Sequence, residues 1–557
     1  MFKDLITDIV IETMILKGYM DVKRMHRNTA DALKKNEALL FKILKTNQDT
    51  EYGKKYNFSN IKTIDDFRKY VPFTHFSDYE PYVKRMIDND EKNLLTALPV
   101  VGYAQSSGSV GARKFIPLTQ YQINTYTNNT ITRTLALTDK YYKEHGLKMF
   151  KRGRGSSTCV AFNDFLPNGL LCSNVADVAA RQLGFLYPYI LNVPFAGFFD
   201  IADIDSRYAN LRFALEDRNM MYIFSAFFMN ISDLIGYLKL YWEIFVEDIR
   251  NGTISDIANI NESVRDKFMN TIKPNPQRAD ELQKEFEKGF DETILKRIWP
   301  NLAVISGIGT SSFAPFAKKI RTMAKDIPFD YSIYGASEGL FAACDELESE
   351  KQLMLVDSCY YEFIPVDNPD RILSLNELEV GSEYEIVITN NSGLYRYRCG
   401  DVIKVVDYLN ECPYIVFSHR IGQLLNLTGE KTTEEHMQAV VNELAKIADC
   451  TIDNWVVYNN IDDQPCHYVL MLENKEGKDL TVYQEKANEI LSEKNPRFGI
   501  VLFSGVYGKM TLQNLKFGAQ EEWRKKMIAS GTVPEQVKPV RILDNEAKEK
   551  FFLDRLI

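Results

Sequence analysis

Short apolar segments alternate with longer helical segments through the middle of this chain, and this alternation limits the possible folds more than any other feature. Segments 221–225 (MYIFS) and 302–306 (LAVIS) are typical of buried strands, and 231–249 between them has the apolar period of a helix. The segment 98–104 (LPVVGYA) also has the pattern of a buried strand, after a first hundred residues that favour helices. Strands that alternate with helices predict a layered α/β body.

The pattern changes after residue 380, where strands follow one another at 383–389, 402–406 and 414–418. A short polar break, 419–423 (HRIGQ), separates them from a compact α+β region. In that region we predict helix 433–448, strands 452–458 and 467–473, helix 480–494, strand 500–507 and helix 518–529. The sequence therefore predicts an α/β fold with additional β-structure in an N-terminal domain, 1–419, and a small C-terminal α+β cap domain, 420–557.

The net charge and the cysteine pattern limit which kinds of partner and which cellular compartment we expect. The formal net charge is −9, whereas proteins that wrap nucleic acid need clustered basic charge, so we expect no nucleic-acid partner. The eight cysteines form no CxxC pair, and scattered thiols favour a reducing, cytoplasmic location.

No apolar run approaches the ~20 residues needed to cross a bilayer, so we expect no membrane partner. The apolar N-terminus carries Asp4, Asp8 and Glu12, which favours an amphipathic helix packed on the body over a signal peptide.

A loop of small and hydroxylated residues, 106–114 (SSGSVGARK), follows the strand 98–104. Such a loop can direct backbone N–H groups and the hydroxyls of Ser106, Ser107 and Ser109 toward a phosphate. It lacks the GK[ST] of a Walker A loop, and a flexible hairpin turn explains it equally well.

A strand that ends in a tight turn is predicted over 331–339 (YSIYGASEG). The turn carries an aromatic ring, Tyr334, on which an adenine can stack, and a carboxylate, Glu338, which can ligate Mg²⁺. The alternative is an ordinary turn with a solvated glutamate.

The segment 393–404 (GLYRYRCGDVIK) predicts a strand on which Arg396 and Arg398 face the same side. Asp401 then begins the next strand, where it could accept hydrogen bonds from a ribose diol. The alternative is a charged edge strand. Further on, Thr432 or Thr433 could cap the following helix, but capping does not account for Arg420 or Lys431.

Taken together, these pieces resemble the acyl-acid amido synthetases of the plant auxin-responsive (Gretchen Hagen) family, within the adenylate-forming superfamily. The resemblance rests on the loop 106–114 with its following strand, on 334–338, on the segment 395–402 (YRYRCGDV), and on Arg420 with 426–434. The segment 395–402 is the most specific of these. The resemblance covers about residues 100–545.

The resemblance implies a nucleotide site. By similarity, Ser106, Ser107 and Ser109 bind the phosphates, Tyr334 stacks on adenine, and Gly309 lies in the loop beneath the base.

It also implies the catalytic groups. By similarity, Glu338 binds Mg²⁺, Asp401 binds the ribose hydroxyls, and Arg420 lies at the domain hinge among the nucleotide-binding residues. Lys431 and Lys538 are the two candidate catalytic lysines, and both belong to the cap. A lysine offsets negative charge on the α-phosphate as pyrophosphate leaves.

The implied activity is ATP- and Mg²⁺-dependent adenylation of a carboxylic acid, followed by transfer of the acyl group to the amine of an amino acid. The partners are then a small acyl acid and an amino acid, and a monomer is favoured. Two alternatives stay open at this point: an acyl-CoA ligase of the same superfamily, and a nucleotide-binding protein without catalysis.

Overall fold

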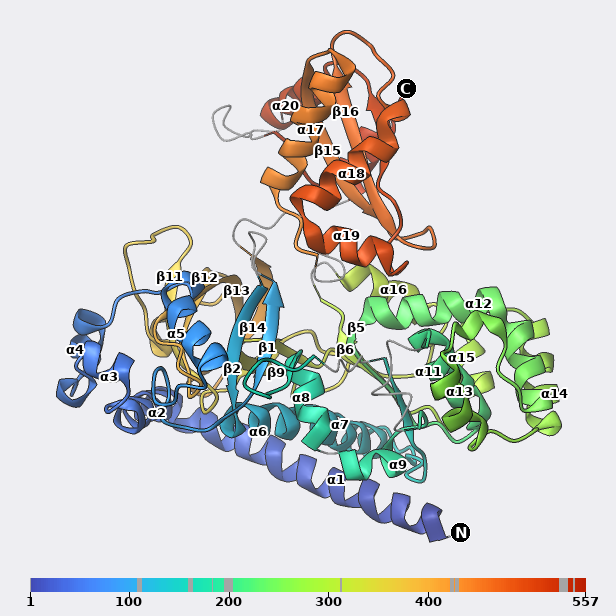
Figure 1. The fold of residues 1–557 in the computed structure, drawn as a ribbon, viewed down its shortest axis with the longest axis horizontal. Helices are drawn as coiled ribbons and strands as arrows, with labels where there is room; N and C mark the ends of the chain where they lie inside the picture. Colours follow the sequence, from blue (N-terminus) through green and yellow to red (C-terminus); the bar gives the residue numbers. More distant parts are fainter. Residues whose placement is uncertain are drawn as a thin grey trace. The chain divides into compact units, whose positions relative to one another are not determined.

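The computed structural model describes residues 2–107, 113–158, 164–182, 184–194, 204–310, 313–420, 425, 430–529, 539–543 and 546–557 (Figure 1). They form two compact units. Unit 1 comprises residues 1–106 and 114–420, and unit 2 comprises residues 107–113 and 421–557. Each unit has an apolar core of its own.

The N-terminal part of unit 1 is helical, as predicted. Its longer helices are α1 (Phe2–Asn28), α2 (Ala32–Asn47), α4 (Ile64–Tyr70) and α5 (Phe76–Asp88). The start of α4 follows from a capping box, in which Thr63 and Asp66 satisfy each other's backbone N–H groups.

Helix α1 lies along α7 (Ile131–Glu144), and its residues Ile11 and Ile15 are buried in a shared cluster (Figure 1). The expectation of a simple amphipathic helix is incomplete, because α1 is also apolar on its outer side. Leu16 and Met20 there are 64% and 65% exposed. None of the described helices is long and apolar enough to span a bilayer.

Strands that alternate with helices form a four-stranded parallel sheet in unit 1, which confirms the predicted α/β body. Its order is β3 (Gly155–Ser157), β5 (Tyr222–Phe227), β6 (Val304–Ile308) and β7 (Phe329–Asp330). Helix α12 (Phe228–Asn251) follows β5 directly and packs on β5 and β6 (Figure 1). A second, three-stranded sheet has the order β2 (Arg113–Thr119), β1 (Val100–Ser107) and β4 (Cys172–Ser173).

The third sheet of unit 1 has seven strands in the order β11-β12-β13-β14-β10-β9-β8. The strands are β8 (Ile333–Ala336), β9 (Gly339–Ala343), β10 (Gln352–Met354), β11 (Tyr360–Pro365), β12 (Glu383–Thr389), β13 (Tyr397–Leu409) and β14 (Cys412–Arg420). Each pair of neighbours is antiparallel. The predicted strands 383–389, 402–406 and 414–418 all lie in this sheet.

The prediction that Arg396 and Arg398 face the same side of one strand is wrong. Strand β13 begins only at Tyr397, and Arg396 lies in the turn before it with a left-handed φ of 47°. Its guanidinium is buried and paired with Glu362, with Nε to Oε2 at 2.8 Å. Arg398 instead pairs with Glu385 on the neighbouring strand β12. The turn separates the two arginines, and each satisfies a different carboxylate.

Unit 2 contains a three-stranded sheet with the order β15-β16-β17. Its elements are α17 (Glu434–Ala448), β15 (Ile452–Asn460), β16 (His467–Asn474), α18 (Gln484–Lys494), α19 (Pro496–Phe503), β17 (Thr511–Leu515), α20 (Ala519–Ala529) and α21 (Glu546–Leu553). The pair β15–β16 is antiparallel and the pair β16–β17 is parallel. Movement of a cap over 420–557 stays a prediction.

The predicted strand 500–507 is wrong, because most of it lies in or just after helix α19. Asn495 accepts a hydrogen bond from the Phe498 N–H, and Pro496 occupies the first turn, where its missing N–H is harmless. These two start signals outweigh the β-propensity of the apolar run that follows. The third strand of the sheet is β17, eight residues beyond the end of α19.

Candidate functional site

The hairpin between β8 and β9 carries Glu338, and side chains from other parts of unit 1 hold it in place. The Asn390 amide donates to the Glu338 carbonyl at 2.7 Å, and Gln122 donates to the Ser337 carbonyl at 3.0 Å. Gln122 lies on α6 (Gln120–Asn129) and Asn390 follows β12. The predicted tight turn after a strand is therefore confirmed, and two segments distant in sequence fix its backbone.

The Glu338 side chain is only 7% exposed. The Tyr397 hydroxyl donates to its Oε1 at 3.3 Å. Lys114, at the start of β2, interacts electrostatically with Glu338. Burial lowers the pKa of Lys114 below its usual range, Glu338 opposes that shift, and the positive charge of Arg420 adds to it. A phenol therefore donates to this buried carboxylate, and two cations interact with it electrostatically.

Asp401 on β13 and Arg420 on β14 are cross-strand partners in register. Arg420 Nε donates to Asp401 Oδ1, and the Tyr334 hydroxyl donates to Oδ2 at 3.0 Å. Tyr334 is on β8, and three strands lie between β8 and β13 in the sheet order. A direct hydrogen bond across that separation requires the sheet to curl, and the curl brings Tyr334, Asp401 and Arg420 together.

The electrostatics of this group favour a permanently charged Arg420. Burial alone disfavours the guanidinium, but the adjacent Asp401 and then Glu338 keep the pKa of Arg420 above its ordinary value. Burial and the Asp401 charge raise the pKa of Tyr334 well above its usual range, so its hydroxyl stays a hydrogen-bond donor. The ring of Tyr334 is 7% exposed and packs against Phe341 and Phe417.

Gly309 follows β6, where the chain passes very close to two aromatic rings. A Cβ at this position would lie 2.7 Å from Phe228 Cδ2 and 3.1 Å from Tyr331 Cδ1. Any side chain larger than hydrogen would displace one of these rings, so packing alone requires glycine here. The role of Gly309 beneath an adenine, like the stacking role of Tyr334, stays a prediction.

The phosphate loop lies largely outside the described residues. Ser106 and Ser107 end strand β1, but their side chains are outside the described part of the structure, as is Ser109 altogether. Lys538 also lies outside the described residues. Lys431 belongs to unit 2, where it precedes the N-cap residue of α17.

Sequence reasoning left three residues of this arrangement off its list of site residues. Lys114 ends the predicted phosphate loop and Tyr397 lies within the YRYR segment, so both had a signal in the motifs. Asn390 had none, because its role depends on the position of its amide beside a hairpin that is distant in sequence.

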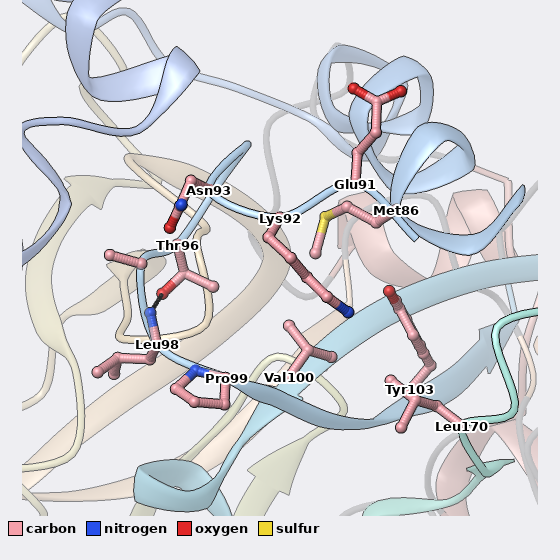
Figure 2. A pocket seen from close by; sticks show the side chains of 11 residues that line it. Met86, Glu91, Lys92, Asn93, Thr96, Leu98, Pro99, Val100, Tyr103 and Leu170 are labelled. Atoms are coloured by element: carbon pink, nitrogen blue, oxygen red, sulfur yellow. Dashed lines mark hydrogen bonds between the residues drawn. The ribbon is translucent and has the colours of Figure 1, made fainter. Parts of the chain in front are cut away.

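A cavity of about 280 Å³ in unit 1 lies apart from this group (Figure 2). Its walls include Met86, Leu98, Val100 and Leu170, and Figure 2 shows the Lys92 side chain directed toward the Tyr103 hydroxyl. The lining includes none of the predicted nucleotide-binding residues, so we do not assign this cavity to the nucleotide.

The fold is similar to that of acyl acid amido synthetases whose structures have been solved. The structure aligns with that of a GH3.15 acyl acid amido synthetase at a TM-score of 0.63, over 95% of this chain and 94% of that one, with 23% identity. A structure titled AtGH3.15 acyl acid amido synthetase in complex with 2,4-DB gives a TM-score of 0.64, over 97% of this chain and 96% of that one, with 22% identity.

The sequence identifies the family. The GH3 family N-terminal domain matches residues 21–329, the central domain residues 352–420 and the C-terminal domain residues 434–547. The chain belongs to the GH3 family, as the resemblance implied.

Curated relatives agree with this assignment. A jasmonoyl-L-amino acid synthetase, JAR4, of Nicotiana attenuata is 29% identical over 84% of this chain and 82% of its own length. The 4-substituted benzoates-glutamate ligase GH3.12 of Arabidopsis thaliana is 26% identical over 84% of this chain and 83% of its own length. GH3 family members adenylate an acid and conjugate it to an amino acid, and the chain is an amido synthetase, that is, a ligase.

Proposed function

We propose that this chain uses ATP with Mg²⁺ to adenylate a small carboxylic acid and then forms an amide with an amino acid. A free carboxylate does not acylate an amine at neutral pH, because oxide is a poor leaving group. In the first step a carboxylate oxygen attacks the α-phosphorus and pyrophosphate leaves. In the second step the amine attacks the acyl carbon, and AMP leaves with that oxygen. The chain needs no nucleophilic side chain for either step.

The observation that carries this proposal is the hydrogen-bonded group of Tyr334, Asp401 and Arg420. A carboxylate oxygen has two lone pairs, and each oxygen of Asp401 accepts one hydrogen bond from these partners. Within the described part of the chain these are the side-chain hydrogen bonds to Asp401, so we propose that the second acceptor position of each oxygen receives one of the two hydroxyls of a ribose. A hydrogen bond from a ribose hydroxyl to a carboxylate is stronger than one to a neutral acceptor.

Glu338 fits the Mg²⁺ expected with ATP. Among the described residues, no group of three or more His, Cys, Asp or Glu side chains could hold a metal ion by itself. Mg²⁺ in nucleotide enzymes is commonly held by one or two carboxylates together with substrate phosphates and water. A single fixed carboxylate such as Glu338 matches that pattern. The ion would neutralise charge on the phosphates, while Lys114 supplies a second positive charge beside Glu338.

The relatives favour an amide product over a thioester. By name, curated relatives of this chain are amino acid or amido synthetases or an amino acid ligase, with acids that range from jasmonate to indole-3-acetate and benzoates. Because these acids differ so much in shape, we propose a carboxylic acid and an amino acid as the substrate classes and name no single acid.

The test is ATP–pyrophosphate exchange with a panel of carboxylic acids, followed by product analysis with amino acids or CoA as the acceptor. We expect acid-dependent exchange and an amide product. A thioester from CoA, with no amide from any amino acid, would favour the acyl-CoA ligase alternative. ATP binding without exchange for any acid would favour a nucleotide-binding protein without catalysis.

A further inference from the structure

Lys431 has an unusual backbone conformation for a lysine. Its φ is 48°, in the left-handed region that residues with a Cβ rarely adopt. A left-handed conformation is energetically unfavourable for a residue other than glycine, so it persists only where its surroundings fix it. The contacts of its two neighbours show what fixes it here.

Glu430 and Thr432, on either side of Lys431, are almost completely buried, at 1% and 0% exposure. The Tyr468 hydroxyl donates to the Glu430 carboxylate, and the Thr432 hydroxyl lies 3.1 Å from the same Tyr468 oxygen. Asn495 donates to the Glu430 carbonyl at 2.9 Å and to the Thr432 hydroxyl at 3.1 Å. Two side chains from elsewhere in unit 2 therefore hold both neighbours of Lys431.

These two side chains are themselves fixed by the core of unit 2. Tyr468 lies on β16, is 0% exposed and stacks on Phe498 with ring centroids 5.6 Å apart. Asn495 precedes α19, where its side chain also accepts the Phe498 N–H. The hydrogen-bonded set of Glu430, Thr432, Tyr468 and Asn495 is called the turn clamp below.

A polar clamp at this place is not explained by stability. Burying a carboxylate is costly even when it accepts a hydrogen bond, and apolar residues of similar volume often pack as well or better. What hydrogen bonds add over apolar packing is a fixed geometry. The geometry fixed here is that of one residue, Lys431, which is more exposed than the clamped residues that flank it.

We propose that Tyr468 and Asn495 are positioning residues that set the direction of the Lys431 side chain for catalysis. This inference rests on the proposed function and on the family resemblance, which makes Lys431 one of the two candidate catalytic lysines. A lysine side chain is flexible, so its effective concentration at a phosphate depends on where its backbone is held. The clamp restricts the backbone of the turn that carries Lys431.

The test is a double-mutant cycle between Tyr468→Phe and Lys431→Ala, with both half-reactions measured separately. Tyr468→Phe keeps the ring stacked on Phe498 and removes only the hydroxyl. The matched control is Tyr458→Phe, a half-buried tyrosine on the neighbouring strand β15. Amide hydrogen exchange of peptides over 430–433 gives a second readout that does not depend on activity.

We expect Lys431→Ala to slow one half-reaction by ~10²–10³ in kcat, and Tyr468→Phe to slow the same half-reaction on the order of 10-fold with little change in KM. The double variant should be no slower than Lys431→Ala alone, because the clamp acts through that lysine. Exchange over 430–433 should speed up in Tyr468→Phe and not in Tyr458→Phe.

Three results would overturn the inference. Exchange over 430–433 that is unchanged in Tyr468→Phe would show that the hydroxyl does not hold the turn, whatever the activity. Equal slowing by Tyr468→Phe in the presence and absence of Lys431 would show a general structural effect. Full activity of Lys431→Ala would remove Lys431 from catalysis while leaving the adenylation proposal intact. Failure of the adenylation proposal would look different. In that case the parent protein would catalyse no pyrophosphate exchange with any of the acids tested.

Discussion

Asp401 and Arg420 are opposite each other on β13 and β14, and a hydrogen bond from Arg420 Nε joins their side chains. Arg420 is the last residue of unit 1, and the described part of unit 2 resumes at residue 425. Asp401, which we propose binds the ribose, is therefore hydrogen-bonded directly to Arg420, the last residue of unit 1. This relationship makes Asp401 the most informative position for mutation.

Replacing Asp401 with Ala should abolish detectable acyl-AMP formation without unfolding the protein. The change removes both acceptor oxygens proposed for the ribose and leaves Arg420 without its carboxylate partner. Hydrogen bonds to a charged group contribute ~1.5–3 kcal/mol each, so two of them account for a loss of more than a hundredfold. Pyrophosphate exchange measures the effect, and circular dichroism checks the fold.

The matched control is Asp407→Ala, on the same strand β13. Asp407 pairs with Lys351 at the surface, and its side chain is 55% exposed. It should retain parental exchange. Near-normal exchange in Asp401→Ala would rule out the ribose role.

Replacing Arg396 with Ala should destabilise unit 1 strongly. Arg396 and Glu362 are 4% and 1% exposed, and the guanidinium also donates to the Val71 carbonyl at 2.9 Å. Removing one member of a buried ion pair typically costs ~3–5 kcal/mol. Urea denaturation measures the loss. As a control, Lys325→Ala breaks an exposed pair with Glu292, for which we expect a far smaller loss. Equal, small losses for both variants would contradict a structural role for Arg396.

Asp233, on α12, should make the stability of unit 1 depend on pH. Burial first, and then the negative charge of Asp205, raise its pKa to about 6 from 3.8, although Arg207 opposes the shift. The folded state holds the Asp233 proton more tightly than the unfolded state, so protonation of Asp233 stabilises the folded state. This stabilising contribution is fully present below about pH 4 and is lost as the pH rises through about 6.

Asp233→Asn should therefore increase the free energy of unfolding at pH 7 by ~1–3 kcal/mol, with the difference vanishing near pH 4. Urea denaturation across pH 4–7 measures this difference. Asp256→Asn, an exposed position in the same region, should give a curve parallel to that of the parent. A destabilising effect of Asp233→Asn at pH 7 would show that the ion pair with Arg207 outweighs the burial.

Lys538→Ala should slow adenylation by ~10²–10³ and leave amide formation from supplied acyl-AMP largely intact. The reason is that negative charge builds between the attacking carboxylate and the α-phosphate in the first half-reaction. Lys525→Ala, an exposed lysine on α20, is the control. If Lys538→Ala adenylates at the parental rate, Lys431 becomes the main candidate for the catalytic lysine.

The sequence predicted the strands better than the connections between them. Segments such as 383–389 coincide with a strand, because their apolar pattern reports burial directly. The turn at Arg396 and the helix α19 were both predicted as strands, for the same reason. In each case the local hydrophobicity favoured a strand, whereas the turn and the start of the helix depend on backbone conformation. The motifs also indicated Tyr334, Asp401 and Arg420 separately. That they share one hydrogen-bonded group follows only from the curl of the seven-stranded sheet, which no local pattern encodes.

The contacts of Glu338 show the same limit. Its own turn was predictable from the segment 331–339, whereas the amide of Asn390 and the phenol of Tyr397 that surround it come from strands far along the chain. Long-range contacts of this kind depend on strand order, and strand order has no signature in a single sequence.

The most direct test of adenylation is to follow the oxygen atoms of the acid. The chain is incubated with ATP, Mg²⁺, an amino acid and an acid whose carboxylate carries ¹⁸O, and the nucleotide and phosphate products are analysed by mass spectrometry. Attack on the α-phosphorus followed by acyl transfer predicts AMP that contains one ¹⁸O atom and pyrophosphate that contains none. Label in inorganic phosphate together with ADP would mean an acyl phosphate intermediate instead, and would contradict the account.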